Sequence, residues 1–120
     1  MIDKRRYVRL DTELALTFER KGLGSLKGEA TVKNVSARGL CFVSKISLGV
    51  GEKIYMTLTL PKESRPIALE GRVKWVQPLP PISSFEIGVE LTQTTSVDEN
   101  QFLLFVCDLM CERLTQMKLL

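Results

Sequence analysis

The stretch Ile54-Tyr55-Met56-Thr57-Leu58-Thr59-Leu60 places an aliphatic residue or a methionine at every second position. A period of two sends alternate side chains to opposite faces of an extended strand. Antiparallel strands show this pattern when one face covers a core and the other meets solvent. The stretch therefore predicts an antiparallel strand, and it favours a fold in which a sheet supplies most of the core.

The same alternation recurs before and after this stretch. The alternating apolar residues form three further sets: Leu14, Leu16 and Phe18; Ile67, Leu69, Val73 and Trp75; and Ile87, Val89 and Leu91. Residues 30–33 and 40–43 add two short strands, and turn-forming residues separate these segments. Short strands joined in sequence predict a small all-β barrel or sandwich over residues 10–93.

Two residues of the strand at 67–75 carry expectations of their own. Gly71 stands where an inward side chain is expected, so we predict a bulge or a barrel corner there. Close approach of a ligand is the alternative explanation for this glycine. Trp75 continues the alternation of Leu69 and Val73, so we predict that its side chain packs in the core. The less favoured alternative is that a base of the ligand stacks on it.

A helix is predicted over residues 96–119. Ser96 and Glu99 have the spacing of a capping box, in which the serine hydroxyl accepts from the amide three residues on. Apolar residues then recur at helical spacing: Phe102, Phe105, Val106, Leu109, Met110, Leu114 and Met117. We expect this stripe to pack on the barrel, with a homodimer contact as the alternative for part of it. Residues 1–120 then form a single domain.

Composition narrows the classes of function. The chain contains no histidine, which excludes a serine or cysteine nucleophile paired with a histidine base, and it has no GxxxxGK[ST] phosphate loop. Cys41, Cys107 and Cys111 lack CxxC spacing, so we expect reduced packing residues and no metal site. The sequence shows no signal peptide and no apolar run long enough to span a membrane. We expect a cytoplasmic protein that is not an enzyme.

Positive charge gathers at the beginning of the chain. Within residues 1–9, a single acidic residue stands against four basic ones, Lys4, Arg5, Arg6 and Arg9, so this segment matches the net charge of +3 of the whole chain. A cationic arm on a nearly neutral body fits a small anionic ligand better than a long DNA or RNA footprint. We expect residues 1–9 to be flexible without a ligand, and a plain solvated tail is the alternative.

Two short motifs suggest what that ligand is. Arg5 and Arg9 are four residues apart, and Asn34, Ser36 and Gly39 read Asn-x-Ser-x-x-Gly. A guanidinium group binds a phosphate or the O6 and N7 atoms of guanine through two parallel hydrogen bonds, and its flat face stacks on a base. The polar turn offers hydrogen bonds to a base edge, although the same residues also suit a simple Asx or serine turn.

This pair of motifs resembles the PilZ domain family, whose pattern is R-x-x-x-R on an N-terminal segment followed by [D/N]-x-S-x-x-G on a barrel. Residues 71–75 and 87–91 resemble later strands of such a domain, so the likeness covers nearly the whole chain. The resemblance implies a six-stranded antiparallel PilZ-type β-barrel with one C-terminal helix. It also implies a bacterial receptor for cyclic di-GMP that needs no cofactor.

The resemblance further implies a role for each motif residue. Arg5 and Arg9 are expected to grip guanine and phosphate, Asn34 and Ser36 to bind a guanine edge, and Gly39 to allow close approach or to shape the turn. Asn34 stands where many members carry aspartate, so we expect weaker binding than a carboxylate would give. Secondary contacts are expected from three other basic residues: Lys4, Arg6 and Arg38.

Binding is then expected to fold the arm over the ligand and to present a changed surface to an unidentified effector protein. The alternative is an adaptor of the same fold that binds no nucleotide, as in pilus or motility assembly. Such adaptors typically lack parts of the two motifs, whereas this chain has both. A barrel that binds single-stranded nucleic acid needs several exposed aromatic residues, and only 7% of this chain is aromatic.

Overall fold

Six strands and one helix make up the part of the chain that the computed structural model describes, which is residues 8–20, 24–63, 65–80, 83–92 and 96–118. The strands are β1 (Leu10–Arg20), β2 (Leu26–Ser36), β3 (Gly39–Ser44), β4 (Lys53–Leu58), β5 (Ile67–Leu79) and β6 (Ser84–Leu91). The helix is α1 (Val97–Lys118). Within these residues, no helix is long and apolar enough to cross a membrane.

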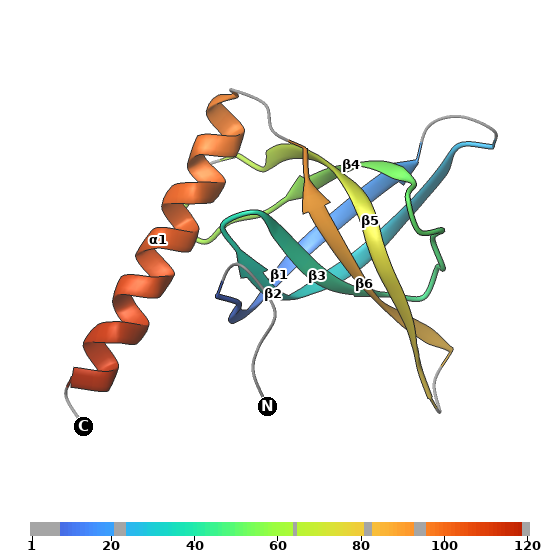
Figure 1. The fold of residues 1–120 in the computed structure, drawn as a ribbon. Coiled ribbons are helices and arrows are strands. Elements are labelled where there is room, and N and C mark those ends of the chain that lie inside the picture. Colours follow the sequence, from blue (N-terminus) through green and yellow to red (C-terminus); the bar gives the residue numbers. More distant parts are fainter. Residues whose placement is uncertain (1–7, 21–23, 64, 81–82, 93–95, 119–120) are drawn as a thin grey trace.

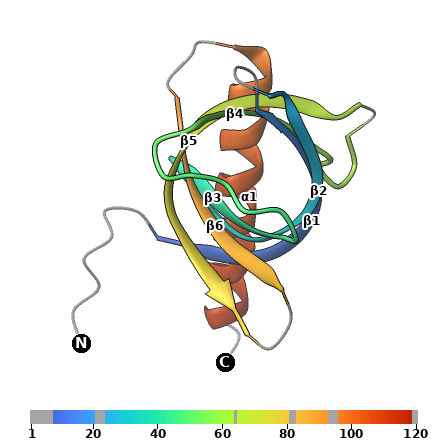
Figure 2. The same cartoon turned by 90° about the vertical axis from the view of Figure 1, so that its right-hand side faces the viewer.

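The strands close into a barrel in the order β1-β2-β3-β6-β5-β4, and every neighbouring pair is antiparallel. Figure 1 shows the barrel from the side, with α1 lying across one of its ends. Figure 2 looks along the barrel, and α1 crosses behind it. The predicted fold class is therefore confirmed. Closure matters because it leaves no unpaired sheet edge among these strands.

The apolar alternation determines which side chains point into the barrel. Leu16, Ile54 and Leu58 are at most 2% exposed. The rings of Phe18 and Phe42 stack with their centroids 5.4 Å apart in the same core. These buried residues stand at alternate positions of their strands, so the alternation determines which residues form the core, as expected.

Gly71 lies at a position of β5 where the barrel has no room for a side chain. A Cβ atom at this position would lie 2.5 Å from Cγ1 of Val89 and 2.8 Å from the carbonyl oxygen of Glu90, so no side chain fits. The pairing of β5 with β4 and β6 is regular at Gly71, and the irregularity of β5 falls between Val73 and Trp75. The bulge predicted at Gly71 therefore lies a few residues farther along the strand.

The helix α1 packs on the barrel through one of its faces. Phe102 and Val106 are buried in the barrel core, and Phe105, Leu109 and Met110 pack against it while partly buried. The predicted stripe is wrong at its far end, because the side chain of Leu114 is 52% exposed. Leu114 therefore does not belong to the face that packs on the barrel. The side chain of Met117 lies outside the described residues.

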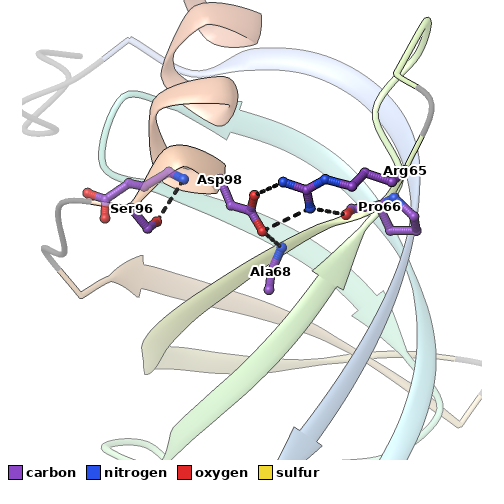
Figure 3. Close-up of polar contacts among 6 residues, drawn as sticks. Arg65, Pro66, Ala68, Ser96 and Asp98 are labelled. Atoms are coloured by element: carbon purple, nitrogen blue, oxygen red, sulfur yellow. Dashed lines mark hydrogen bonds and ion pairs between the residues drawn. The ribbon is translucent and has the colours of Figure 1, made fainter.

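Hydrogen bonds fix both ends of α1. Ser96 Oγ accepts from the amide of Glu99 at 3.0 Å, which confirms the predicted cap. Asp98 accepts from the Arg65 guanidinium at 2.7 Å and from the Ala68 amide at 2.8 Å, and Figure 3 draws both contacts. These contacts, the Arg65 hydrogen bond first, lower the pKa of the Asp98 carboxyl. Near the other end, the guanidinium of Arg113 donates to the backbone carbonyl of Asp11 at the start of β1.

Candidate functional site

A pocket of about 270 Å³ lies on the outer surface of the barrel, where β2 and β3 meet β5 and β6. It brings together the predicted residues Arg9, Asn34, Ser36 and Gly39, and Arg38 also lines it. The remaining lining residues come from β3, β5 and β6: Leu40, Lys74, Trp75, Gly88, Val89 and Glu90. Residues far apart in the chain thus converge on one cavity. Lys4, Arg5 and Arg6 lie outside the described residues.

An irregularity in β2 aims two of these side chains. The register of β2 against β3 shifts between Val32 and Asn34, so one extra residue, Lys33, is accommodated there. Val32 and Val35 are both fully buried although they are three residues apart. Asn34 and Ser36 flank Val35 and therefore both point to the outer face, into the pocket.

A second irregularity, in β5, turns Trp75 outward. The register against β6 passes from Val73 opposite Val89 to Trp75 opposite Gly88, which makes Lys74 the extra residue. Val73 is buried, and Val76 takes the next place against the core. Trp75 consequently lines the pocket and does not belong to the buried core, so the predicted core position is wrong. A bulge reverses the faces of all later residues, which the alternation alone cannot show.

Gly88 makes room for this tryptophan. A Cβ atom on Gly88 would lie 2.2 Å from Cε2 and Nε1 of Trp75. The indole ring therefore lies directly over the backbone of β6. This contact positions the ring within the pocket, where it can meet a cation or an aromatic group.

Arg9 lies over that ring. Its guanidinium carbon is 5.7 Å from the centroid of Trp75, which is within the range of a cation–π contact. The next residue, Leu10, is buried and pairs with Val35 of β2, so the beginning of β1 anchors Arg9 beside the pocket. The fold thus positions Arg9, with its guanidinium group over the ring of Trp75.

The electrostatics of the pocket favour an anion. Within the described residues, neither Arg9 nor Arg38 forms an ion pair with a carboxylate. Oε2 of Glu90 lies 3.7 Å from Nζ of Lys74, so the charges of these two side chains compensate each other. Two partly buried arginines remain without an anionic partner in the described part of the chain. A phosphate group would supply that partner through hydrogen bonds between charged groups.

The turn between β2 and β3 has a compact backbone. The Ser36 hydroxyl donates to the carbonyl oxygen of Gly39 at 3.4 Å, and the amide of Leu91 donates to the carbonyl oxygen of Arg38 at 2.8 Å. A Cβ atom on Gly39 would lie 2.3 Å from the carbonyl oxygen of Val89. The close approach that Gly39 permits is therefore to β6, the neighbouring strand. It fixes the turn on which Ser36 and Arg38 stand.

The three cysteines lie in different surroundings. Cys41 is buried between its cross-strand partners Asn34 and Gly88, and its thiol donates to Glu86 Oε1 at 3.3 Å. Burial first, and then the hydrogen bond and charge of Glu86, raise the pKa of the Cys41 thiol to about 12. The thiol therefore stays protonated at neutral pH. Cys107 and Cys111 are exposed, so the prediction that they are packing residues is wrong. Among the described residues, no cluster of metal-ligating side chains occurs.

A larger hollow of about 720 Å³ lies on the outer face of β1, β2, β4 and β5. Its lining includes Glu19, Glu29 and Glu70, with Lys27 as a basic residue, and it contains none of the motif residues. Carboxylates repel a phosphorylated ligand, so the smaller pocket beside Arg9 is the candidate site.

Sequence reasoning missed the contribution of β5 and β6 to this site. Trp75, Lys74 and Gly88 line the pocket because of the bulge, and the strand pattern suggested a regular alternation. One signal was present in the sequence. Val76 follows Trp75 directly, and two large apolar neighbours cannot both point into the barrel from a regular strand.

Comparison with known proteins agrees with this geometry. A family model for the PilZ domain matches residues 3–106. The PilZ domain of YcgR from Escherichia coli, solved with c-di-GMP, has a TM-score of 0.71 and 12% identity, with 97% of this chain and 98% of that chain covered. No curated protein matched the sequence.

Two longer proteins share the fold. The complex of MrkH from K. pneumoniae with c-di-GMP has a TM-score of 0.70 and 16% identity, with 96% of this chain and 56% of that chain covered. The motility inhibitor MotI of Bacillus subtilis has a TM-score of 0.67 and 22% identity, with 92% of this chain and 53% of that chain covered. The present chain therefore spans about half the length of MrkH and MotI. At these identities the likeness establishes the fold.

Proposed function

The chain belongs to the PilZ domain family, and we propose that it is a non-enzymatic cytoplasmic receptor for cyclic di-GMP. The structures of YcgR and MrkH named above contain this dinucleotide, which makes it the first ligand to test. The observation that carries the proposal is the convergence of Arg9, Asn34, Ser36 and Arg38 on one pocket beside Trp75. A fold alone does not imply a ligand, so the argument rests on this pocket.

The pocket has partners for each part of the ligand. Cyclic di-GMP carries two phosphates and two guanines. In our proposal, Arg9 binds a phosphate or the O6 and N7 atoms of a guanine while Trp75 supports its guanidinium from below. Asn34 and Ser36 hydrogen-bond the edge of a guanine, and Arg38 contacts a phosphate. The side-chain amide oxygen of Asn34 accepts hydrogen bonds from guanine but lacks the negative charge of an aspartate. The affinity for cyclic di-GMP is therefore lower than an aspartate would give.

The basic arm completes the site in this proposal. Arg5 is the principal contact, and Lys4 and Arg6 add positive charge. Ordering an arm costs about 1–2 kcal/mol of backbone entropy per residue. Several contacts with a doubly charged ligand are therefore needed to offset that cost. The resulting change in surface is the signal that an effector protein would read.

Calorimetric titration with cyclic di-GMP tests the proposal directly. The expected result is heat of binding together with a rise in melting temperature that grows with ligand concentration. Ser36→Ala should weaken binding, and Asn34→Asp should preserve or strengthen it. Lys45→Ala is the matched control, because Lys45 is exposed and does not line the pocket. Absence of heat and of any thermal shift would reject the ligand and leave a nucleotide-independent adaptor as the explanation.

Protection from trypsin tests the movement of the arm separately. Trypsin cleaves after Lys4, Arg5 and Arg6, and mass spectrometry of the shortened chain reports each cut. Cyclic di-GMP should slow these cleavages in the parent protein. If binding is seen by calorimetry but the cleavage rates do not change, the receptor function stands and the arm does not close over the ligand.

A further inference from the structure

The helix α1 carries a second apolar face that the described part of the barrel leaves uncovered. Leu104 is 63% exposed and Leu114 is 52% exposed, and Cys107 and Cys111 between them are exposed as well. Phe102 and Val106 face the barrel, so Leu104 and Cys111 lie on the opposite side of the helix, with Cys107 and Leu114 toward one flank. In Figure 1, no other described element lies on the outer side of α1. We call Leu104, Cys107, Cys111 and Leu114 the outer seam.

The outer seam has the spacing of a helix–helix contact. Successive residues are three, four and three positions apart, which is the a/d pattern of a heptad repeat. Val97 lies seven residues before Leu104 and continues the same line, and it is also exposed. Only five large apolar side chains are strongly exposed in the described residues, and three of them stand on this line. Such a concentration on one helix face marks an interaction surface.

We propose that a second copy of this chain covers the outer seam, with the two α1 helices packed antiparallel. The seam reads leucine, cysteine, cysteine, leucine in both directions, with the same spacing each way. A twofold axis through its midpoint therefore places Leu104 of one copy against Leu114 of the other, and Cys107 against Cys111. A self-complementary surface of this kind is what a symmetric dimer requires.

The helix dipoles also favour the antiparallel orientation, because an antiparallel pair of α1 helices opposes them. A seam of four residues is short, so we expect a weak dimer whose population depends on concentration.

The mass of the full-length protein in solution, measured by light scattering over a range of concentrations under reducing conditions, tests the dimer. The parent should shift from monomer toward dimer as concentration rises, and Leu104→Glu and Leu114→Glu should remain monomeric. Val50→Glu is the matched control, because Val50 is 69% exposed but lies in a loop away from α1. A parent that stays monomeric, or seam variants that dimerise like the control, would overturn the proposal. Circular dichroism verifies that each variant is folded.

Disulfide trapping tests the orientation. Oxidation by dioxygen with copper–phenanthroline joins two thiols only when their Cα atoms lie within about 7 Å. Cys107→Ser and Cys111→Ser should each fail to cross-link alone, and a mixture of the two should form a covalent dimer. Cross-linking of each variant by itself indicates a parallel pair and contradicts the proposal. Cys41 is fully buried and does not interfere.

Asp108 provides a second measure of orientation. It lies beside the seam, one residue from Cys107, and the antiparallel axis brings the two copies of Asp108 close together. Repulsion between the two Asp108 carboxylates opposes association of the two copies. Asp108→Asn should therefore increase the fraction of dimer at a fixed concentration. An unchanged or smaller fraction would contradict the antiparallel arrangement.

Discussion

Two pairs of arginines in this protein lie in contrasting surroundings. Arg65 and Arg113 are engaged within the chain: Arg65 pairs with Asp98 at 2.7 Å, and Arg113 donates to the Asp11 carbonyl. Arg9 and Arg38 line the pocket and form no ion pair with a carboxylate in the described residues. The first pair holds α1 against the barrel. The second pair is left for an anion, so substitutions in the two regions should have separable effects.

The largest expected effect is on stability, at the contact between α1 and the barrel. Phe102→Ala removes a fully buried ring and should lower the free energy of unfolding by about 3–5 kcal/mol. Leu104→Ala, on the exposed face of the same helix, should change it by less than about 0.5 kcal/mol when measured at low protein concentration. Urea unfolding followed by circular dichroism gives both values. Equal losses in the two variants would show that α1 does not stabilise the barrel through this face.

The next effect is on ligand affinity alone. Arg9→Ala should weaken cyclic di-GMP binding by about 10- to 150-fold, because a hydrogen bond to a charged group contributes about 1.5–3 kcal/mol. The melting temperature of the ligand-free protein should stay close to that of the parent. Calorimetry and thermal unfolding provide the two measurements. If Arg9→Ala lowers stability and leaves affinity unchanged, the contrast between the two pairs of arginines is wrong.

Trp75 should contribute a similar or smaller amount. Stacking of a base or a guanidinium on an aromatic ring contributes about 1–3 kcal/mol, so Trp75→Ala should weaken binding by about 5- to 150-fold. Trp75→Phe keeps an aromatic face and should lose less. Trp75 is the single tryptophan of the chain, so its fluorescence reports the pocket directly. Titration of the parent should change that fluorescence, and a constant signal at saturating ligand would place the ligand elsewhere.

The comparison between the barrel and its pocket also shows what the sequence could predict. The alternating pattern was sufficient for the strands and most of the core, because burial of one face repeats every two residues. The motif residues Arg9, Asn34 and Ser36 were identified from their types and order. Trp75 was assigned to the core because a bulge at Lys74 reverses the faces, and bulges depend on pairing between strands. Leu114 was assigned to the inner stripe because a helix with two apolar faces has no single preferred side.

The smallest effect concerns the ion pair at the beginning of α1. The guanidinium of Arg65 and the amide of Ala68 hold the pKa of Asp98 below its ordinary value of 3.8. A carboxyl group whose pKa is lower in the folded state stabilises the fold above the unfolded-state pKa, and this contribution is lost as pH falls through the folded-state pKa. The parent should therefore melt above Asp98→Asn at neutral pH, and the difference should shrink as pH drops below 3.8. The Arg65 side chain is 58% exposed, so water and salt screen the ion pair, and the difference should be small and should decrease with added salt. Thermal unfolding across this pH range at low and high salt measures it. A difference that persists in full at the lowest pH would mean that the amide of asparagine strains the cap, and that the charge on Asp98 contributes nothing.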